Sequence, residues 1–531
     1  MSTAAIRSSM ATPPQAETGS ADTWITTLWY RGSRGSQHRW MTTHANAFPV
    51  GERLGTRAWG MLLVLCGALF LDAMDVSMVG VALPSIRTDL DMSTSSLQWV
   101  VSAYVLGYGG FLLLGGRAAD LLGRRRVFLV ALGVFVVASA LGGLVDDGSL
   151  LIATRFVKGV SAAFTAPAGL SIITTSFAEG PLRNRAIAIY TATGATGFSL
   201  GLVVGGLMTE IGWRWVFFLP VPVALVTLAA GIVLVPRHAP AVGPGRSFDV
   251  AGAVTLTVAM LLLVFTVVEA PDAGWVSVRT LASFAAVAGL LAAFVTVERR
   301  TAAPLMRLGI LRSPSLVQAN LGAMTLIGGW FGFQFIATLY MQQLRGWSPL
   351  ETGLAIFPGG FLVAVLAPRI APLVMRFGTR RLITAGLAST AVGYALFLPV
   401  GLDSGYATAM LPTMLFGGLG FALAYGPLNI AATNGVRPDE QGLASGLVNT
   451  SFQFGGALVL AVATAVSSAF TVADASPQGL LDGFQAAVVV SVIAAALGAV
   501  VSAVRLRPRL VPVTATAAVD APETEPEAEA A

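Results

Sequence analysis

The chain has 531 residues, of which 55% are apolar and only 11% are charged, and its mean hydropathy is +0.76. Soluble globular proteins carry about 25% charged residues because their surface faces water. This composition excludes a water-soluble protein and predicts that lipid surrounds most of the chain. The single cysteine, Cys66, excludes an internal disulfide framework. His38, His44 and His238 lie outside the apolar runs, so no metal site is expected.

Residues 1–57 are polar and contain no apolar run typical of a signal peptide. We expect a disordered cytoplasmic tail there, with either Met1 or Met41 as the start. Apolar segments of about 20 residues follow, each long enough to cross a membrane as a helix. We predict fourteen such helices, over 58–83, 97–116, 127–145, 150–174, 187–209, 214–235, 249–269, 279–297, 316–341, 351–375, 382–400, 406–432, 443–470 and 482–505. Residues 506–531 are expected to form a second disordered cytoplasmic tail.

Arginines are distributed unequally between the two sets of alternating loops. One set holds Arg124, Arg125, Arg126, Arg183, Arg185, Arg237, Arg246, Arg299, Arg300, Arg307, Arg312, Arg376, Arg380, Arg381, Arg437, Arg505, Arg507 and Arg509. The other set holds only Arg87, Arg214, Arg279 and Arg345. Basic loops stay in the cytoplasm, so both termini are predicted to be cytoplasmic. The basic pI therefore indicates membrane orientation and not nucleic-acid binding. Because Lys158 is the only lysine, we interpret the arginine bias as that of a GC-rich bacterium and expect its cytoplasmic membrane.

The sequence repeats itself at offsets of roughly 255–260 residues. The segment GRAADLLGRRR at 116–126 is echoed at 368–381, and the segment around Pro167 is echoed around Pro427. We predict an all-α membrane protein of two six-helix bundles, 58–236 and 316–505, with helices 7 and 8 inserted at 237–315. Parallel repeats of this kind are a transporter architecture with the substrate site between the halves.

Charged residues within the predicted helices are expected to be paired or functional, because an unpaired charge at membrane depth costs several kcal/mol. Helix 1 carries Asp72 and Asp75, and helix 4 carries Arg155 and Lys158, each pair on one helix face. Counting about 1.5 Å per residue places Asp75 and Lys158 at similar depth. One interpretation is a purely structural salt bridge. The other is proton coupling, in which Asp75, together with Asp72, carries protons and the two bases tune its proton affinity.

The loop after helix 2 combines an acid, glycines and arginines. Asp120 lies between Gly116 and Gly123 and is followed by Arg124 and Arg125. Taken alone, these arginines only indicate a cytoplasmic loop. The spacing also favours a latch in which Asp120 pairs with an arginine or a helix N-terminus and so gates the inner mouth.

Two further sets of residues favour movement and substrate binding. Helix 5 has a glycine stripe on which another helix can pack backbone to backbone, formed by Gly194, Gly197, Gly201, Gly205 and Gly206. Aromatic or neutral polar residues either line a substrate cavity or only bond neighbouring helices, and the candidates are Tyr104, Tyr108, Gln334, Gln342, Asn429, Asn449 and Gln453.

These segments resemble the major facilitator superfamily, in its fourteen-helix drug:proton antiporter branch, over residues 58–505. The segments that carry the resemblance are 75–84 in helix 1, 116–126 after helix 2, 155–167 in helix 4, 194–206 in helix 5 and 442–458 in helix 13. The resemblance implies a multidrug efflux transporter.

The chain departs from the pattern of that branch at several positions. Gly80 replaces an asparagine, Lys158 a glutamine and Leu202 a proline, and Met375 stands where Asp120 would be repeated. Asp72 is an addition to the pattern. We expect this second acid either to pair with Lys158 or to attract a cationic solute.

We therefore expect a secondary active transporter that exports drug-like or amphipathic small molecules in exchange for protons by alternating access. The proton gradient is its expected energy source, with no cofactor and no enzymatic activity. Its expected partners are the small-molecule substrate and membrane lipids, with no nucleic acid, and we expect a monomer. Alternatives are a dedicated exporter of one endogenous metabolite, such as an antibiotic or siderophore, and a non-transporting membrane receptor or scaffold.

Overall fold

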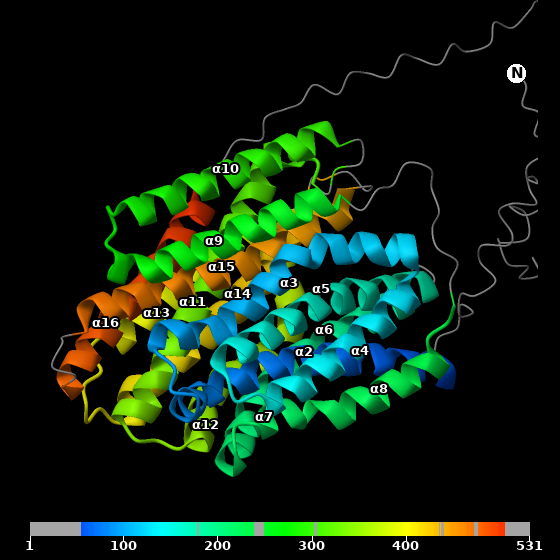
Figure 1. Ribbon diagram of the computed structural model, residues 1–531. Coiled ribbons are helices and arrows are strands. Elements are labelled where there is room, and N and C mark those ends of the chain that lie inside the picture. The colour runs from blue at the N-terminus through cyan, green and yellow to red at the C-terminus, as the bar shows by residue number, and fades with distance from the viewer. Residues whose placement is uncertain are drawn as a thin grey trace, which may run out of the picture. The chain divides into compact units, whose positions relative to one another are not determined.

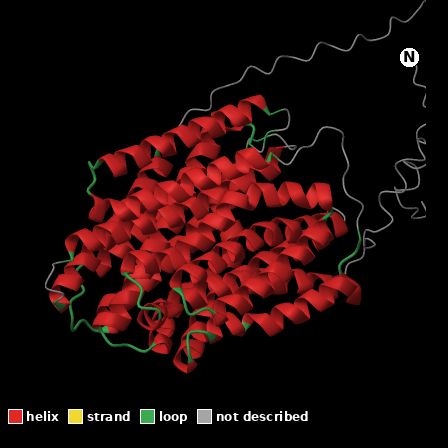
Figure 2. Cartoon of the chain, viewed as in Figure 1, coloured by secondary structure: helices red, strands yellow, loops and turns green. Residues whose placement is uncertain are grey.

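The computed structural model describes residues 55–177, 180–237, 249–301, 304, 306–434, 436, 440–471 and 476–504. Regular structure in these ranges is helical (Figure 2). Residues 1–54 of the tail predicted at 1–57 and all of the tail predicted at 506–531 lie outside the described residues, as do Arg246, Arg437 and Arg505; residues 56 and 57 are helical, which corrects the predicted end of the first tail. Each of the fourteen predicted segments falls on a helix, which confirms the predicted fold class.

The helices of the first half have the following bounds: α2 (Thr56–Asp89), α3 (Thr94–Leu122), α4 (Arg124–Leu144), α5 (Gly148–Ser176), α6 (Pro181–Ile211), α7 (Trp215–Phe218) and α8 (Pro220–Leu234). The inserted helices are α9 (Val250–Ala273) and α10 (Val278–Arg300), followed by the short η3 (Leu308–Arg312). Those of the second half are α11 (Pro314–Leu339), η4 (Tyr340–Leu344), α12 (Pro349–Phe377), α13 (Thr379–Phe397), η5 (Tyr406–Met410), α14 (Leu411–Thr433), α15 (Gln441–Phe470) and α16 (Pro477–Ala503). In the described part, thirteen helical segments are long and apolar enough to cross a membrane. The shorter α13 is the exception, since it begins with Arg380 and Arg381.

Local sequence signals explain where several of these helices begin. Ser93, Asp147 and Ser277 each accept a hydrogen bond from a backbone amide in the first turn of the helix that follows. Ser348 and Glu351 form a reciprocal capping box at the start of α12. Such caps satisfy amides that have no partner within the helix.

The two halves pack their helices in the same pattern (Figure 1). Helix α2 packs against α6 as α11 packs against α15, and α3 packs against α5 as α12 packs against α14. Between the halves, α3 contacts α15 and α6 contacts α12, which is the reciprocal pairing of a pseudo-two-fold arrangement. The turns after α3 and α12 also correspond, because Gly123 (φ 96°) and Gly378 (φ 79°) both have positive φ. The predicted pair of six-helix bundles is confirmed.

The inserted helices form a hairpin on one of the two seams between the halves. Helix α9 packs against both α3 and α15, and α10 packs against α9 (Figure 1). The approach of α9 to α3 is close, since a Cβ at Gly110 would lie 2.2 Å from the hydroxyl of Thr257. The hairpin therefore covers the α3–α15 seam, whereas the α6–α12 seam has no such cover among the described helices.

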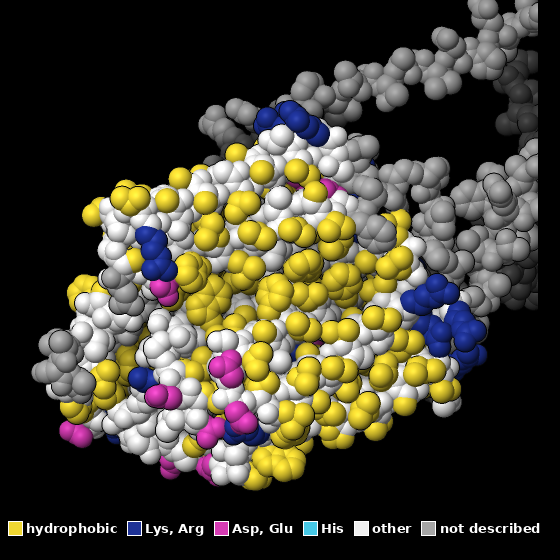
Figure 3. Space-filling view, viewed as in Figure 1, with side chains coloured by type: hydrophobic (Ala, Val, Ile, Leu, Met, Phe, Trp, Pro, Cys, Tyr) yellow, Lys and Arg dark blue, Asp and Glu magenta, His cyan; other side chains and the backbone are white. Residues whose placement is uncertain are grey.

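The bundle has two chemically different ends. Figure 3 shows a dense dark blue group at the right edge of one face and most of the magenta side chains toward the lower left, where some dark blue ones lie beside them. The arginine-rich end comprises the α3–α4 and α12–α13 turns, with Arg124, Arg125, Arg126, Arg380 and Arg381. The acidic end comprises the turns that hold Asp89, Asp91, Asp146, Asp147 and Asp403.

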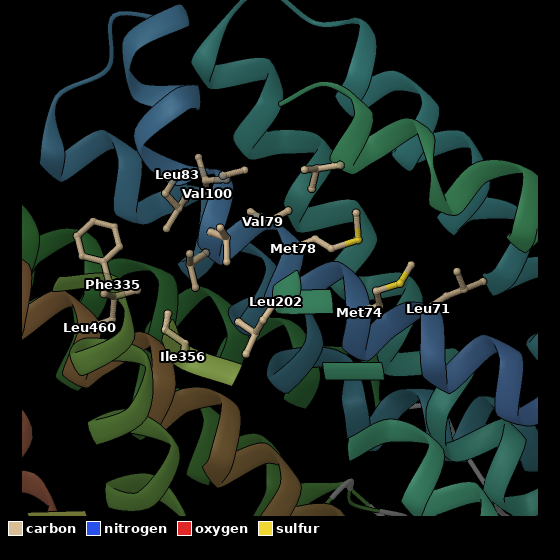
Figure 4. Packing of buried hydrophobic residues seen from close by; sticks show 14 of the residues in the cluster. Leu71, Met74, Met78, Val79, Leu83, Val100, Leu202, Phe335, Ile356 and Leu460 are labelled. Carbon is tan, nitrogen blue, oxygen red and sulfur yellow. The ribbon is translucent and has the colours of Figure 1, made fainter. Parts of the chain in front are cut away.

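The halves are packed together at the acidic end. One buried apolar cluster contains side chains of both halves, among them Leu202, Phe335, Ile356 and Leu460 (Figure 4). A Cβ at Gly353 would lie 2.2 Å from the carbonyl oxygen of Leu202, so α12 and α6 touch backbone to backbone.

Packing between the halves is lost along α12 toward the arginine-rich end. The last buried residue of α12 is Gly359, and none of residues 360–377 is buried. A helix that passed between two packed halves would bury one face over its whole length. The α6–α12 seam is therefore closed at the acidic end and open at the arginine-rich end.

Candidate functional site

A buried ion cluster joins α2 to α5 within the first half. The guanidinium of Arg155 donates to one carboxylate oxygen of Asp75, and the ammonium of Lys158 donates to the other. None of the three side chains is more than 1% exposed. Arg155 and Lys158 reach the same carboxylate because residues three apart share a helix face. The predicted proximity of Asp75 to both bases is therefore observed in the structure.

Neighbouring helices hold both cations in place. The Nε of Arg155 donates to the carbonyl oxygen of Val100 at 3.0 Å, and its guanidinium lies 4.5 Å from the ring centroid of Tyr104. Such stacking on an aromatic face favours a cation. Tyr104 is itself only 1% exposed and stacks on the ion cluster in this structure, and its role in lining a substrate cavity stays a prediction.

Sequence reasoning missed Ser139 of α4. The ammonium of Lys158 donates to the Ser139 hydroxyl at 3.0 Å, and that hydroxyl donates to the carbonyl oxygen of Phe217 at 2.8 Å. The rings of Phe135 and Phe217 flank the ammonium at 4.6 and 5.3 Å. A signal was present, because Ser139 is an isolated polar residue in the apolar run of α4.

Asp72 lies one helical turn from Asp75 and is 7% exposed. Its Oδ2 atom is buried and has no hydrogen-bond partner among the described residues. Asp72 interacts electrostatically with Asp75 and Lys158, but the Lys158 ammonium is bonded to Asp75 and Ser139 instead. Of the two expectations for this additional acid, pairing with Lys158 is not observed.

Helices α3 and α5 approach closely beside the ion cluster. A Cβ added at Gly159 would lie 2.0 Å from the carbonyl oxygen of Tyr104, and one at Gly107 would lie 2.6 Å from that of Phe156. Both distances are shorter than a normal non-bonded contact. These glycines allow α3 and α5 to lie close enough for Arg155 to bond the backbone of α3.

Gly159→Ala is expected to destabilise the protein, because its methyl group forces α3 away from α5. Overpacking of this kind costs about 1–3 kcal/mol. The measurement is thermal unfolding of the purified protein, with the loss of the monodisperse species on heating as the signal. Gly133→Ala in α4 is the control, because no atom lies within 4 Å of its added Cβ and no loss is expected. Equal stability of the two variants would contradict the argument.

The glycine stripe of α6 packs mainly onto α2. Added Cβ atoms at Gly197, Gly201 and Gly205 would lie 2.6 Å or less from atoms of α2, and one at Gly194 would lie 3.4 Å from Leu69. Gly206 faces the other half, where its Cβ would lie 2.6 Å from the Cα of Leu350. The stripe thus seats α6 against both α2 and α12.

The predicted gating loop lies at the arginine-rich end, between α3 and α4. Asp120 is 38% exposed in its side chain and accepts a hydrogen bond from Arg124 at 3.2 Å. Arg125 donates to the carbonyl oxygen of Ile232. A Cβ added at Gly116 would lie 3.8 Å from Pro167, and Gly123 makes the turn. Among the described residues, Asp120 near the end of α3 pairs with Arg124 at the start of α4, and no ion pair joins it to the second half.

Three of the neutral candidates for a substrate cavity differ in whether their hydrogen bonds reach the other half or stay within one helix. Gln342 donates to the carbonyl oxygen of Val81 at 2.8 Å and so joins the halves at the acidic end. Asn429 and Asn449 donate to carbonyl oxygens of their own helices, at 2.9 and 2.8 Å.

Gln334 and Gln453 occupy space left by glycines of the first half. Gln334 is 5% exposed, and its Nε2 atom lies 3.0 Å from the Cβ position of Gly80, where it has no hydrogen-bond partner among the described residues. The missing side chain at position 80 therefore makes room for Gln334. Gln453 packs on Gly109 through its own Cβ atom, which lies 2.7 Å from the position of a Cβ added at Gly109. Tyr108, which is partly buried, lies beside Tyr104 with ring centroids 6.2 Å apart.

Two repeated six-helix bundles with ion pairs at membrane depth define a multi-pass membrane transporter. Residues 65–460 match the Major Facilitator Superfamily. The chain belongs to this superfamily.

Relatives of known role include the cephamycin export protein CmcT of Amycolatopsis lactamdurans, which is 39% identical over 85% of this chain and 93% of its own length. The puromycin resistance protein pur8 of Streptomyces alboniger is 37% identical over 80% and 86%. Among solved structures, the peptide transporter POT in complex with sulfate has a TM-score of 0.62 at 15% identity, covering 87% of this chain and 98% of that chain. The nucleoside transporter NupG has a TM-score of 0.58 at 13% identity, covering 83% and 98%. The two solved structures share the fold.

Proposed function

We propose that the protein exports drug-like or amphipathic small molecules across the bacterial cytoplasmic membrane in exchange for protons. The observation that carries the coupling is Asp75, which is fully buried and bonded to both Arg155 and Lys158. A proton can bind Asp75 only when one of these ion pairs separates. Protonation is thereby linked to movement of α2 against α5, which a purely structural salt bridge would not require.

The export part of the proposal is supported by relatives that span most of the chain. They include proteins for cephamycin export and for tetracenomycin C resistance and export, and a multidrug resistance protein. Each of these names describes the relative itself. We extend export of an antibiotic-type molecule from the two relatives named for export to this chain.

In the proposed orientation the arginine-rich end faces the cytoplasm, with both termini on that side. The open seam then gives a cytoplasmic solute access to the boundary between the halves, and the packed acidic end blocks release. Alternation would close the arginine-rich end through Asp120 and its neighbouring arginines and open the acidic end. The glycine stripe of α6 provides the smooth surface on which α2 and α12 can move.

The proton gradient is the proposed energy source, without a cofactor, and the proposed functional unit is a monomer in contact with membrane lipid. A receptor or scaffold would not need a buried ion cluster and an open seam in the same structure. A dedicated exporter of one metabolite would use the same machinery, and only the range of substrates separates it from a multidrug exporter.

Transport in inverted membrane vesicles tests the proposal. The vesicles are energised to be acidic inside, and candidate cationic dyes and antibiotics are added while the internal pH is followed. We expect substrates to release protons from vesicles that contain the protein and not from vesicles without it. Response to one compound of a broad panel would identify a dedicated exporter. Accumulation of a compound without proton release would contradict proton exchange.

A further inference from the structure

Two acids outside the ion cluster meet at the base of the inserted hairpin. Asp249 precedes α9 as its N-cap, and Glu298 lies in the last turn of α10. They are 7% and 4% exposed, so both carboxyl groups are buried. A Cβ added at Gly252 would lie 2.7 Å from Oε1 of Glu298 and 2.9 Å from Oδ2 of Asp249. The missing side chain of Gly252 therefore lets the two carboxyl groups come within hydrogen-bond reach of each other.

Backbone amides fix the orientation of both acids. The amide of Gly252 donates to Oδ1 of Asp249 at 3.0 Å, and the amide of Met306 donates to Oε2 of Glu298 at 2.9 Å. Oε1 of Glu298 lies toward Asp249 and has no hydrogen-bond partner among the described residues. An ionised carboxyl group only accepts hydrogen bonds, so two facing acids cannot bond each other unless one carries a proton.

The surrounding charges favour one proton over a metal ion. Ca²⁺ and Mg²⁺ take about six or more oxygen ligands, and the described part of the chain has no group of three acidic, histidine or cysteine side chains suited to a metal. Arg117 of α3 acts electrostatically on Glu298 and balances one ionised carboxyl group, whereas two would leave an excess buried charge. The other charges on neighbouring segments are Arg307, which pairs with Glu440, and Arg312 of η3.

The pair holds the start of the linker that leads into the second half. Met306 is bonded to Glu298, and Arg117 donates to the carbonyl oxygen of Pro304 at 2.7 Å. Met306 also packs on a buried apolar cluster of the second half, and Arg117 belongs to the gating segment at 116–126. The hairpin, the gating segment and the second half therefore meet at this linker.

We propose that Asp249 and Glu298 form a proton-binding site that is separate from the ion cluster. With one shared proton, the two carboxyl groups bond each other and Glu298 holds Met306. Without it, two buried negative charges repel each other, Glu298 turns away and the amide of Met306 is released. In the proposed orientation this end faces the cytoplasm, so the site senses cytoplasmic pH. The site requires neither export nor proton exchange and therefore stands apart from the proposed function.

The test is hydrogen–deuterium exchange of the purified full-length protein, without substrate or a proton gradient, in peptides that contain the Met306 amide. Exchange is compared between about pH 6 and about pH 9, after correction for the base-catalysed chemical rate. The folded pair binds a proton that the separated acids release near neutral pH, so its contribution is present at low pH and lost as the pH rises. We expect protection of Met306 to fall about tenfold or more over this range.

Two variants imitate the protonated pair. In Glu298→Gln and in Asp249→Asn, the amide nitrogen donates permanently to the remaining carboxylate. Asparagine also retains the N-cap bond to Gly252. We expect both variants to keep the protection of Met306 at every pH tested. Asp147→Asn is the matched control, because Asp147 caps α5 in the same way but is exposed, and the full pH response is expected to remain.

Three results would overturn the proposal. The first is protection of Met306 that does not change with pH in the wild type. The second is a wild-type pH response in Glu298→Gln or Asp249→Asn. The third is recovery of protection at high pH on addition of about 1 mM Ca²⁺ or Mg²⁺, which would assign the pair to a metal ion. Each of these results leaves the role proposed for Asp75 untouched.

Discussion

Asp75→Asn is expected to abolish proton-driven export, with a loss of at least about a hundredfold in initial rate. The variant removes the carboxylate to which Arg155 and Lys158 are both bonded, and with it the group whose protonation separates the ion pairs. The measurement compares proton-driven uptake into inverted vesicles with exchange of labelled for unlabelled substrate without a gradient. We expect exchange to persist, because it requires only that the substrate-loaded protein alternates between its two conformations, without uptake or release of a proton at position 75.

Stability must be separated from coupling in this experiment. Removing one partner of a buried ion pair typically costs about 3–5 kcal/mol, since a charge is left unpaired. The double variant Asp75→Asn with Lys158→Met restores the net charge of the three-residue cluster and leaves Arg155 bonded to the carbonyl oxygen of Val100, so it is expected to recover part of the thermal stability. Export should not recover, because no proton carrier is restored. Recovery of proton-driven export in the double variant would show that the cluster is purely structural.

Gly353→Ala is expected to shift the protein toward the conformation that is open at the acidic end. Its methyl group would lie 2.2 Å from the carbonyl oxygen of Leu202, at a contact that exists only between the halves. Overpacking by about 1–3 kcal/mol corresponds to a change of roughly 5- to 150-fold in the equilibrium between two conformations. Unlike Gly159→Ala, this change need not disturb the packing within either half.

The shift can be measured by thiol labelling. Ile356 is 1% exposed in this conformation, and Ile356→Cys in a Cys66→Ala background gives one reporter at the packed end. We expect Gly353→Ala to raise the rate of maleimide labelling about fivefold or more. Gly133→Ala is again the neutral control. An unchanged labelling rate combined with a lower unfolding temperature would show that the added methyl group only destabilises the protein.

Much of the fold was accessible from the sequence because the membrane imposes simple rules. Apolar length predicted the helices, including α13, which fails a strict apolarity criterion because of Arg380 and Arg381. The repeat offset predicted the two bundles, and the same offset relates the turns at Gly123 and Gly378. Depth counting placed Asp75 and Lys158 at the same level, where they are bonded.

Side-chain pairing and conformational state were not accessible in the same way. Spacing alone could not decide which of Asp72 and Asp75 binds the two cations, since both lie on one face of α2. It could not assign Tyr104 to the ion cluster, because stacking on Arg155 depends on the close approach of α3 and α5. The open arginine-rich end follows from the packing of α6 and α12, and no residue pattern distinguishes it from the closed alternative.

The hairpin of α9 and α10 makes the two sides of the transporter unequal toward the lipid. On the α3–α15 side, a molecule dissolved in the bilayer meets two additional helices before it reaches the boundary between the halves. On the α6–α12 side, it meets the unburied stretch at 360–377. In the proposed orientation, that stretch lies in the inner leaflet. Lipophilic solutes that partition into the membrane would therefore enter sideways from one flank only, and the hairpin breaks the two-fold equivalence that the repeated halves would otherwise give.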